Sequence, residues 1–240
     1  MVTISIVIPA KDEAENLPLL LDGIEAAMAA QEDHEVLVVD DGSADATAEV
    51  LLARMRRQPN LRLIRHDVSG GQSAAVNSGV LVARGAIVCT LDADGQNPPS
   101  ELPRLLAPLL APGSDRIGLV AGQRVGRQDT ASKKLASRLA NWLRAKALKD
   151  GTRDTGCGLK AFRREGFLRL PFFNHMHRYL PALFARDGWE VAHVDVAHAS
   201  RHAGRSHYSN LQRGFVGAVD LLGVMWLIRR RKKSRPSEAR

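Results

Sequence analysis

Two carboxylates stand two residues apart in the stretch LDADGQNPP at 91–99, where a hydrophobic run stops and the chain must turn. The run before it, 86–91, is short, continuous and rich in β-forming residues. Such a run predicts a strand covered on both faces, as in a parallel sheet. Open α/β sheets bind ligands at the carboxyl ends of their strands, and side chains two residues apart in an extended chain point the same way. Asp92 and Asp94 could therefore share one metal ion at this edge.

Two further polar turns, 9–13 and 40–45, follow the predicted strands 4–8 and 35–39. In a parallel sheet, these turns and the Asp-rich turn lie along one edge. A site this acidic repels an anionic ligand unless a divalent cation mediates. Mg²⁺ or Mn²⁺ held by one or two carboxylates plus substrate phosphates is the usual arrangement. Together the three turns predict a site for a nucleoside diphosphate compound.

Each motif alone has a plainer interpretation, because an Asp-x-Asp-Gly turn is common and 40–43 could be only a turn and a helix cap. Their joint placement after successive strands favours the functional interpretation. A dinucleotide fold and a P-loop are excluded, because neither Gly-x-Gly-x-x-Gly nor Gly-Lys-Ser/Thr follows the first strand. An EF-hand counted from Asp92 fails as well, because Asn97 and Pro103 stand where glycine and glutamate are needed.

Hydrophobic periodicity places these turns in an alternating α/β chain. Strands at 4–8, 35–39, 61–65 and 86–91 are separated by segments with helical spacing, and Asn16 is a candidate cap for the first helix. This order predicts a doubly wound, mostly parallel sheet with right-handed crossovers. The second helix is marked by Ala48, Leu51, Leu52 and Met55. Beyond 91 we expect a helix from 99 to 109, a strand at 117–121, an amphipathic helix at 131–149, a glycine-rich turn at 154–158, a less regular aromatic region, a strand at 190–197 and a polar loop at 201–208.

The composition predicts one domain, residues 1–212, followed by an appendage at 213–240. Cys89 and Cys157 form neither a metal knuckle nor a disulfide framework, which favours a reducing compartment. No signal peptide is recognised, because the first apolar run lacks a basic flank and ends at Pro9. The histidines at 175, 177, 193, 198, 202 and 207 have no zinc-motif context, so we expect them to be structural or exposed.

The net charge of +8 is concentrated in two basic zones, 124–149 and 229–240, on an otherwise slightly acidic chain. Two separate zones indicate two anionic contacts better than one nucleic-acid surface. The basic stretches also lack interleaved aromatic residues apart from Trp142, so no specific nucleic-acid binding is expected.

The segment 215–228 is apolar except for Asp220 and runs into the sequence RRRKK at 229–233. Its fourteen residues are fewer than the roughly 20 that span a bilayer. Two interpretations stay open at this point: a helix that packs on the sheet, or an interfacial helix whose basic end is attracted to anionic lipid. A membrane protein partner also stays open.

Six motifs occur in order along residues 3–230 or so: IVIPAxxE at 6–13, VVDDGSxD at 38–45, LDADxQxPP at 91–99, GxR at 122–124, DxGCGxK at 154–160 and RxxGxSxY at 201–208. Together they resemble glycosyltransferase family 2. The likeness is greatest to its polyprenyl-phosphate glycosyltransferase branch, typified by dolichol-phosphate mannose synthase. The resemblance implies a GT-A fold. It also implies inverting transfer of a sugar from a nucleotide sugar, such as GDP-mannose or a UDP-sugar, to dolichyl or undecaprenyl phosphate at the cytoplasmic face of the membrane, by a peripheral protein.

The resemblance also implies roles for individual residues. Those expected to bind the nucleotide sugar are Pro9, Ala10, Glu13, Asp40, Asp41 and Asp92. Those expected to hold Mg²⁺ or Mn²⁺ are Asp92, Asp94 and Gln96. Those expected to meet donor or acceptor phosphates are Arg124, Lys133, Ser137, Arg201 and Ser206. Those expected to act in catalysis are Arg124, Arg201 and, close to the acceptor, Asp154.

The sequence departs from the family pattern in three places. Lys11-Asp12 replaces the usual aromatic-Asn pair, which affects base recognition. Lys133-Lys134 stands where arginine is usual, so a bidentate phosphate grip becomes a point-charge contact. Many relatives also carry C-terminal membrane spans, where this chain has one short apolar segment.

Two alternative functions remain at the level of sequence. A lipid phosphate is already ionised at neutral pH, so its transfer reaction needs no strong general base. A family 2 enzyme acting on a saccharide hydroxyl would need one, and Asp154 is the candidate. A non-catalytic, membrane-surface module that binds nucleotides is the third possibility, against which the intact Asp92, Asp94, Gln96 and Arg124 argue.

Overall fold

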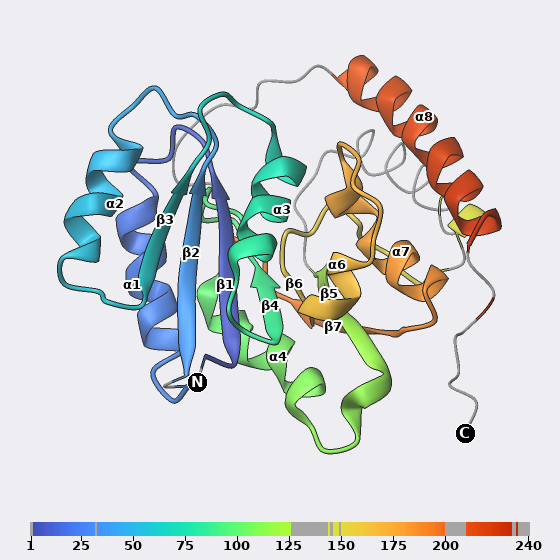
Figure 1. The fold of residues 1–240 in the computed structure, drawn as a ribbon, viewed down its shortest axis with the longest axis horizontal. Helices are drawn as coiled ribbons and strands as arrows, with labels where there is room; N and C mark the ends of the chain where they lie inside the picture. Colours follow the sequence, from blue (N-terminus) through green and yellow to red (C-terminus); the bar gives the residue numbers. More distant parts are fainter. Residues whose placement is uncertain are drawn as a thin grey trace.

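The computed structural model describes residues 2–31, 33–125, 144, 146–148, 150–199, 210–231 and 234. Its centre is a seven-stranded sheet in the order β3-β2-β1-β4-β6-β5-β7, with helices on both faces (Figure 1). The strands are β1 (Ile4–Ala10), β2 (His34–Asp40), β3 (Leu61–Arg65), β4 (Ile87–Thr90), β5 (Ile117–Arg124), β6 (Lys160–Arg163) and β7 (Glu190–Val196). The helices are α1 (Leu17–Ala27), α2 (Thr47–Met55), α3 (Gln72–Val82), α4 (Leu102–Leu110), α6 (Arg164–Leu168), α7 (Leu180–Arg186) and α8 (Asn210–Arg229). Short 3-10 turns are η1 (Pro99–Glu101), η2 (Ser114–Arg116) and η3 (Met176–Arg178).

The first four strands form the parallel half that the sequence predicted. β1 pairs in parallel with β2 and β4, and β2 pairs in parallel with β3. β1 extends two residues past its predicted end, so Pro9 and Ala10 belong to the strand and not to the turn. Asp40 is likewise the last residue of β2. The carboxyl ends of β1, β2 and β4 therefore meet at one edge, as predicted.

The strand β6 was missed by the sequence analysis. It lies between β4 and β5 and runs antiparallel to both, within the region expected to be less regular. Its four residues begin with Lys160 and end with Arg163, so they lack the apolar run that marked the other strands. The antiparallel direction places Lys160 opposite Thr90, the last residue of β4. The start of β6 thus reaches the same edge as the end of β4.

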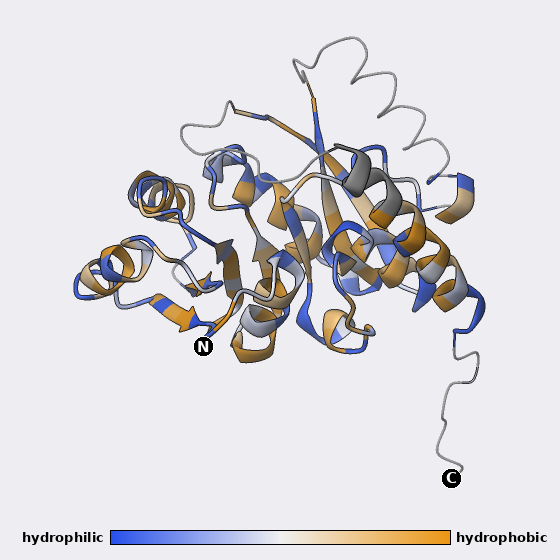
Figure 2. Ribbon diagram, turned by 90° about the horizontal axis from the view of Figure 1, so that it is seen from above, coloured by the Kyte–Doolittle hydropathy of each residue, from blue (hydrophilic) through white to orange (hydrophobic). Residues whose placement is uncertain are grey.

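Apolar residues gather in two clusters, one on each face of the sheet. Ile4, Ile6 and Ile8 point to the face covered by α1, α2 and α4, while Val7 points to the face covered by α3, α6, α7 and α8. This alternation follows from the two-residue period of a strand. Figure 2 shows hydrophobic strands between helices that carry both kinds of residue. Leu52, expected to mark the buried side of α2, is exposed.

Four local expectations need correction or fall outside the described residues. Asn16 precedes α1, but its side chain donates to Glu13 Oε2 at 2.6 Å and does not cap the helix. α8 begins at Asn210, five residues before the predicted apolar segment. The predicted helix 131–149 is described only near its end, where 144 and 146–148 are helical, and the predicted loop 201–208 lies outside the described residues.

α8 packs on α7 and on the residue between η3 and α7. Val224 is buried, and Tyr179 donates a hydrogen bond from its hydroxyl to the carbonyl of Gly217 at 3.1 Å. Arg186 of α7 donates to the carbonyl of Leu227 near the end of α8 at 3.1 Å, which satisfies one of the carbonyls that a helix end leaves open. Within the described part of the chain, no helix combines the length and apolar character needed to cross a bilayer.

Candidate active site

Two of the polar turns are tied to each other by backbone-to-side-chain hydrogen bonds. Asp12 N donates to Ser43 Oγ at 2.9 Å, and Ala44 N donates back to Asp12 Oδ1 at 2.7 Å. Glu13 N donates to Thr47 Oγ1 at 3.0 Å. Asp12 adopts φ +55°, a left-handed conformation that Asp and Asn tolerate best. Asp12 in place of the family's asparagine therefore keeps both the conformation and the oxygen acceptor.

Asp40 stabilises the turn that follows β2. Its side chain is fully buried and accepts hydrogen bonds from Ser43 N at 2.9 Å and Arg65 Nε at 3.2 Å. The side chain of Arg65 is itself more than half exposed, so this pair lies at the boundary between core and solvent. Asp40 thus shapes the turn that follows β2.

Asp41 organises the loop that leads into α3. Its oxygens accept hydrogen bonds from Gly70 N at 2.8 Å, Gly71 N at 2.8 Å and Ser69 Oγ at 2.7 Å, and His66 Nδ1 lies 2.7 Å away. Burial by itself raises the pKa of Asp41, but these donors outweigh burial and hold the pKa below its ordinary value. Asp41 therefore stays ionised, and its carboxylate is occupied by hydrogen bonds from protein groups.

Asp92 is held at the end of β4 by two amide side chains. Gln72 Nε2 donates to Asp92 Oδ1 at 2.7 Å, and Asn97 Nδ2 donates to Asp92 Oδ2 at 3.0 Å. Burial and the nearby charge of Asp94 raise the pKa of Asp92, although Lys160 and Asn97 oppose the shift. A methyl group at Gly158 would overlap the Asp92 carboxylate, so a larger residue there would displace this carboxylate from its place.

The predicted metal ligands form an incomplete oxygen set. Asp94 Oδ1 accepts from Gln96 N at 3.1 Å, which shapes the turn, and Asp94 is close enough to Asp92 to raise its pKa. Within the described residues, no group of three or more His, Cys, Asp or Glu side chains could hold a metal ion by itself. Two carboxylates and one amide oxygen fit Mg²⁺ or Mn²⁺ when ligand phosphates or water complete the coordination.

Arg124 and Asp154 form a two-point ion pair at the end of β5. Arg124 Nε and Nη2 donate to the two carboxylate oxygens of Asp154 at 2.6 and 2.9 Å, and both side chains are about seven-eighths buried. Gln123 Oε1 accepts from the backbone N–H groups of Arg153 and Asp154 at 2.9 and 3.0 Å, which fixes the position of the loop. Two of the three predicted catalytic residues are therefore brought together, but as partners of each other.

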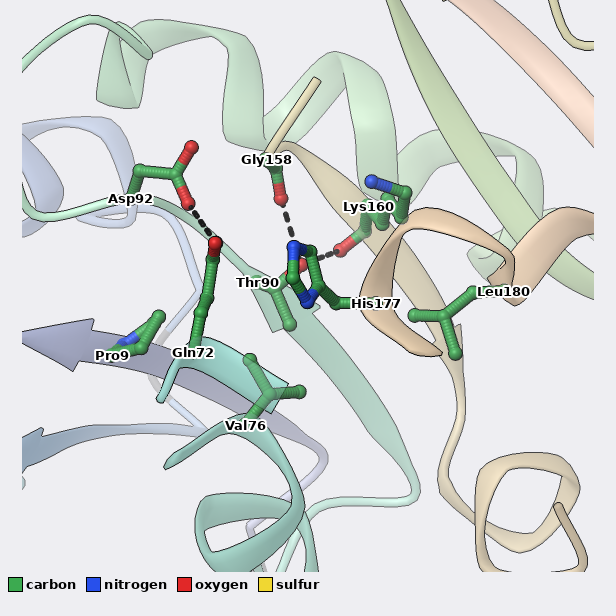
Figure 3. A pocket seen from close by; sticks show the side chains of 9 residues that line it. All are labelled: Pro9, Gln72, Val76, Thr90, Asp92, Gly158, Lys160, His177 and Leu180. Atoms are coloured by element: carbon green, nitrogen blue, oxygen red, sulfur yellow. Dashed lines mark hydrogen bonds between the residues drawn. The ribbon is translucent and has the colours of Figure 1, made fainter. Parts of the chain in front are cut away.

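A pocket opens between the carboxyl ends of β1 and β4 and the start of α7 (Figure 3). It is lined by Pro9, Gln72, Val76, Thr90, Asp92, Gly158, Lys160, His177 and Leu180. Of these, Pro9 and Asp92 were predicted site residues, and Ala10 lies beside Pro9, where its carbonyl accepts from Asp41 N at 2.8 Å. Gln72, Lys160 and His177 were missed. Only Lys160 stood in a recognised motif, and no pattern of spacing links it to His177.

Four predicted phosphate-binding residues lie outside the described residues: Lys133, Ser137, Arg201 and Ser206. Glu13 is described, and its carboxylate accepts from Asn16. The roles of all these residues stay predictions.

The sequence profile of Glycosyl transferase family 2 matches residues 5–170. Two relatives are undecaprenyl-phosphate 4-deoxy-4-formamido-L-arabinose transferases. The one from Photorhabdus laumondii is 36% identical over 208 residues, 86% of this chain and 63% of the relative. The one from Pseudomonas fluorescens is 37% identical over 212 residues, 87% of this chain and 61% of the relative. The chain thus spans less than two-thirds of the length of these curated relatives.

Solved structures agree with this result at the level of the fold. Glucosyl-3-phosphoglycerate synthase from Mycobacterium tuberculosis, in complex with Mn²⁺, UDP and phosphoglyceric acid, superposes with a TM-score of 0.69 at 22% identity, covering 97% of this chain and 80% of that one. The same enzyme with Mg²⁺ and UDP also gives a TM-score of 0.69, at 21% identity over 94% of this chain and 79% of that one. The predicted GT-A type fold is confirmed. The chain belongs to glycosyl transferase family 2.

Proposed function

We propose that this protein transfers a sugar, with inversion, from a nucleoside diphosphate sugar to a polyprenyl phosphate such as undecaprenyl phosphate. The observation that carries the proposal is the arrangement at the sheet edge. Asp92 and Asp94 follow β4, and Arg124 ends β5, where Asp154 holds its guanidinium in place. The relatives named as undecaprenyl-phosphate transferases support the acceptor.

On the donor side, the chain supplies a rigid nucleoside site and an acidic ligand set. The turns after β1 and β2 are locked together through Asp12, Ser43 and Ala44, so the nucleoside meets a preformed wall. Asp92, Asp94 and Gln96 would hold Mg²⁺ or Mn²⁺. When bound, the ion neutralises the charge that develops on the leaving diphosphate.

On the acceptor side, the pairing of Asp154 favours a phosphate over a hydroxyl nucleophile. A hydroxyl acceptor needs a carboxylate within reach of its proton. Both oxygens of Asp154 accept hydrogen bonds from Arg124, and Oδ1 also accepts from Gly156 N at 3.2 Å. An already ionised lipid phosphate needs no base, and the positive charge of Arg124 stabilises negative charge at the reacting phosphates.

The α8 outer face, defined as Val216, Val219, Leu222 and Trp226, supports a peripheral membrane location. These side chains are exposed, although α8 packs on the domain through its other side. Their spacing forms one apolar stripe, and it ends at the exposed run Arg229 to Arg231. Tryptophan is enriched at membrane interfaces, and each basic residue near anionic lipid adds about 1 kcal/mol. We propose that residues 213–240 rest on the cytoplasmic face of the membrane.

The decisive experiment is a transfer assay with the purified protein. It would be incubated with Mg²⁺ or Mn²⁺, a short polyprenyl phosphate and a panel of UDP- and GDP-sugars, and glycolipid would be detected by mass spectrometry. We expect one or a few donors to give a polyprenyl-phosphate sugar, and none of them to glycosylate free saccharides. Transfer to saccharides without any glycolipid would refute the proposed acceptor. Binding of nucleotide without transfer to either acceptor would indicate a non-catalytic module.

A further inference from the structure

The pocket in Figure 3 has two chemically different sides. Pro9, Gln72 and Asp92 lie on its left side in the figure. This side belongs to the carboxyl edge of β1 and β4, where we propose that the nucleotide binds. Lys160, His177 and Leu180 lie on its right side, towards α7. A ligand that places its diphosphate at Asp92 would therefore extend its next group towards Lys160 and His177.

Lys160 brings a buried positive charge to this pocket. Its side chain is almost completely buried, and its register opposite Thr90 of β4 and Ala121 of β5 sets the backbone in the middle of the sheet. Among the described residues, the hydrogen-bond partner of the Lys160 ammonium is the carbonyl oxygen of Cys157. An ammonium has three N–H donors, and buried charged groups are normally hydrogen-bonded. Further N–H groups are thus left for an oxygen in the pocket.

His177 brings a second donor. Its Nδ1 lies 2.7 Å from Ser73 Oγ, and the same Oγ accepts from the backbone N–H of His177 at 3.4 Å. Ser73 is buried, so its hydroxyl proton is best used in a bond to Nδ1. The proton of the neutral ring then sits on Nε2, and a protonated ring also carries one there. In both states Nε2 is a donor.

The pocket has room for about one water molecule, so it would take a single oxygen substituent of a ligand that lies across its mouth. Lys160 and His177 line it on one side, and Val76 and Leu180 add apolar walls. A sugar ring presents hydroxyl oxygens around its edge and C–H groups on its faces, and so matches both features. A further phosphate fits poorly beside the Asp92 carboxylate. We propose that Lys160 and His177 bind an oxygen substituent of the transferred sugar and determine which donor sugar the enzyme accepts.

This inference rests on the proposed function, and binding measurements test it separately from turnover. Calorimetry in the presence of Mg²⁺ would give Kd for a nucleoside diphosphate and for the corresponding nucleotide sugar. In wild type the nucleotide sugar should bind with a lower Kd than the nucleoside diphosphate, and the ratio of the two Kd values is the gain in affinity due to the sugar. In Lys160→Met and His177→Phe this gain should fall by about 10- to 100-fold, because each variant removes a donor to a sugar oxygen. In His177→Phe the Kd of the nucleoside diphosphate alone should change less than about twofold, since its contacts are untouched. Lys160→Met also removes a charge near Asp92, so in that variant the Kd of the nucleotide sugar is compared with the Kd of the nucleoside diphosphate measured in the same variant.

Conservative and substrate controls make the test specific. His177→Gln keeps an N–H donor near the position of Nε2 and should recover most of the lost gain, whereas a purely structural role of the ring would not be rescued by an amide. Deoxy analogues of the donor sugar complete the cycle. The analogue that lacks the contacted hydroxyl should bind wild type more weakly than the parent sugar nucleotide does. The variant that lacks the matching donor should bind the analogue and the parent compound with similar Kd values.

Each result decides the inference. Equal weakening of nucleoside diphosphate and nucleotide sugar, or no change in either, overturns it even if wild type remains an active transferase. A wild-type protein that binds no nucleotide sugar overturns the proposed function together with the inference. If Lys160→Met does not fold, as judged by its thermal transition, the His177→Phe and His177→Gln pair still decides the question.

Discussion

Arg124 grips Asp154 through two hydrogen bonds, from Nε at 2.6 Å and from Nη2 at 2.9 Å, and so joins the end of β5 to the loop before β6. The backbone of this loop is held in turn by Gln123 Oε1. The pair therefore orients a guanidinium at the edge of the sheet where β4 also ends.

Breaking this pair should affect catalysis more than nucleotide binding. Asp154→Asn keeps the size of the side chain but removes the charge that orients Arg124, and Arg124→Lys keeps the charge but loses the planar fork. Each variant is expected to lower kcat by about 10²-fold, the scale of losing one preorganised charge contact. The double variant should be scarcely worse than either single one, because both changes disable one unit. Steady-state kinetics of glycolipid formation would measure this, and fully additive losses would contradict it.

Asp94→Ala should abolish metal-dependent transfer without unfolding the protein. We expect turnover to fall by about two or more orders of magnitude, because the diphosphate loses the ion that offsets its charge. Calorimetric titration of the variant with metal ion, in the presence of nucleoside diphosphate, should show a weaker affinity for the metal than wild type has. Asp115→Ala, at the 3-10 turn before β5, removes a carboxylate far along the strand from the site and serves as the matched control. Near-normal activity of Asp94→Ala would show that Asp94 is not a metal ligand.

Gly158→Ala tests whether the close packing of two segments positions Asp92. The added methyl group would overlap the Asp92 carboxylate, so the carboxylate or the backbone must move. We expect a loss of about 1–3 kcal/mol in the free energy of unfolding and a larger loss in activity. Gly223→Ala is the control, because a methyl group there meets open space and lies in α8, where alanine favours the helix. Urea unfolding and the transfer assay would be compared for both variants.

Polar substitution on the α8 outer face should weaken membrane binding. Leu222 is 67% exposed, and Leu222→Ser should reduce sedimentation with phosphatidylglycerol vesicles. Leu19 on α1 is 68% exposed on the opposite face of the sheet, so Leu19→Ser should leave vesicle binding unchanged. Removal of residues 229–240 should weaken binding most at low salt, where charges are least screened. Equal effects of the two serine variants would argue against the α8 outer face as the membrane-binding surface.

The free energy of unfolding of the protein should depend on pH through Asp41. Its pKa is depressed in the folded protein, because hydrogen bonds from the Gly70 and Gly71 N–H groups, His66 and Ser69 outweigh burial. Such a group stabilises the fold above its unfolded pKa, and this contribution is lost as the pH falls through the folded pKa. The free energy of unfolding of wild type should therefore drop below about pH 4.

The variant Asp41→Asn isolates this contribution. It should be about 1–3 kcal/mol less stable than wild type at pH 7, with a gap that narrows towards pH 3. Asp92, whose pKa is raised, acts in the opposite direction, but it is present in both proteins and cancels in the difference. Urea unfolding from pH 3 to 7 would measure the gap, and Asp67→Asn at an exposed position in the next loop should follow wild type. A gap that stays constant with pH would contradict the assignment.

The parallel half of the sheet could be predicted because its information is local. β1 to β4 are continuous apolar runs with turn signals at their ends, and a buried parallel strand needs little else. The polar turns after these strands could be placed at one edge for the same reason. The antiparallel β6 escaped prediction, because its four residues start and end with charged side chains that are accommodated by long-range contacts.

The sequence by itself therefore determined the class of fold, the acidic turns at the ends of β1, β2 and β4, and the family. Tertiary structure alone decided which of these charges are paired with other protein groups. It joined Asp154 to Arg124 and saturated Asp41 with neighbouring donors. It also carried Lys160 and His177 into one pocket. Such pairings depend on strand order and loop return between residues far apart in sequence, which no local period encodes.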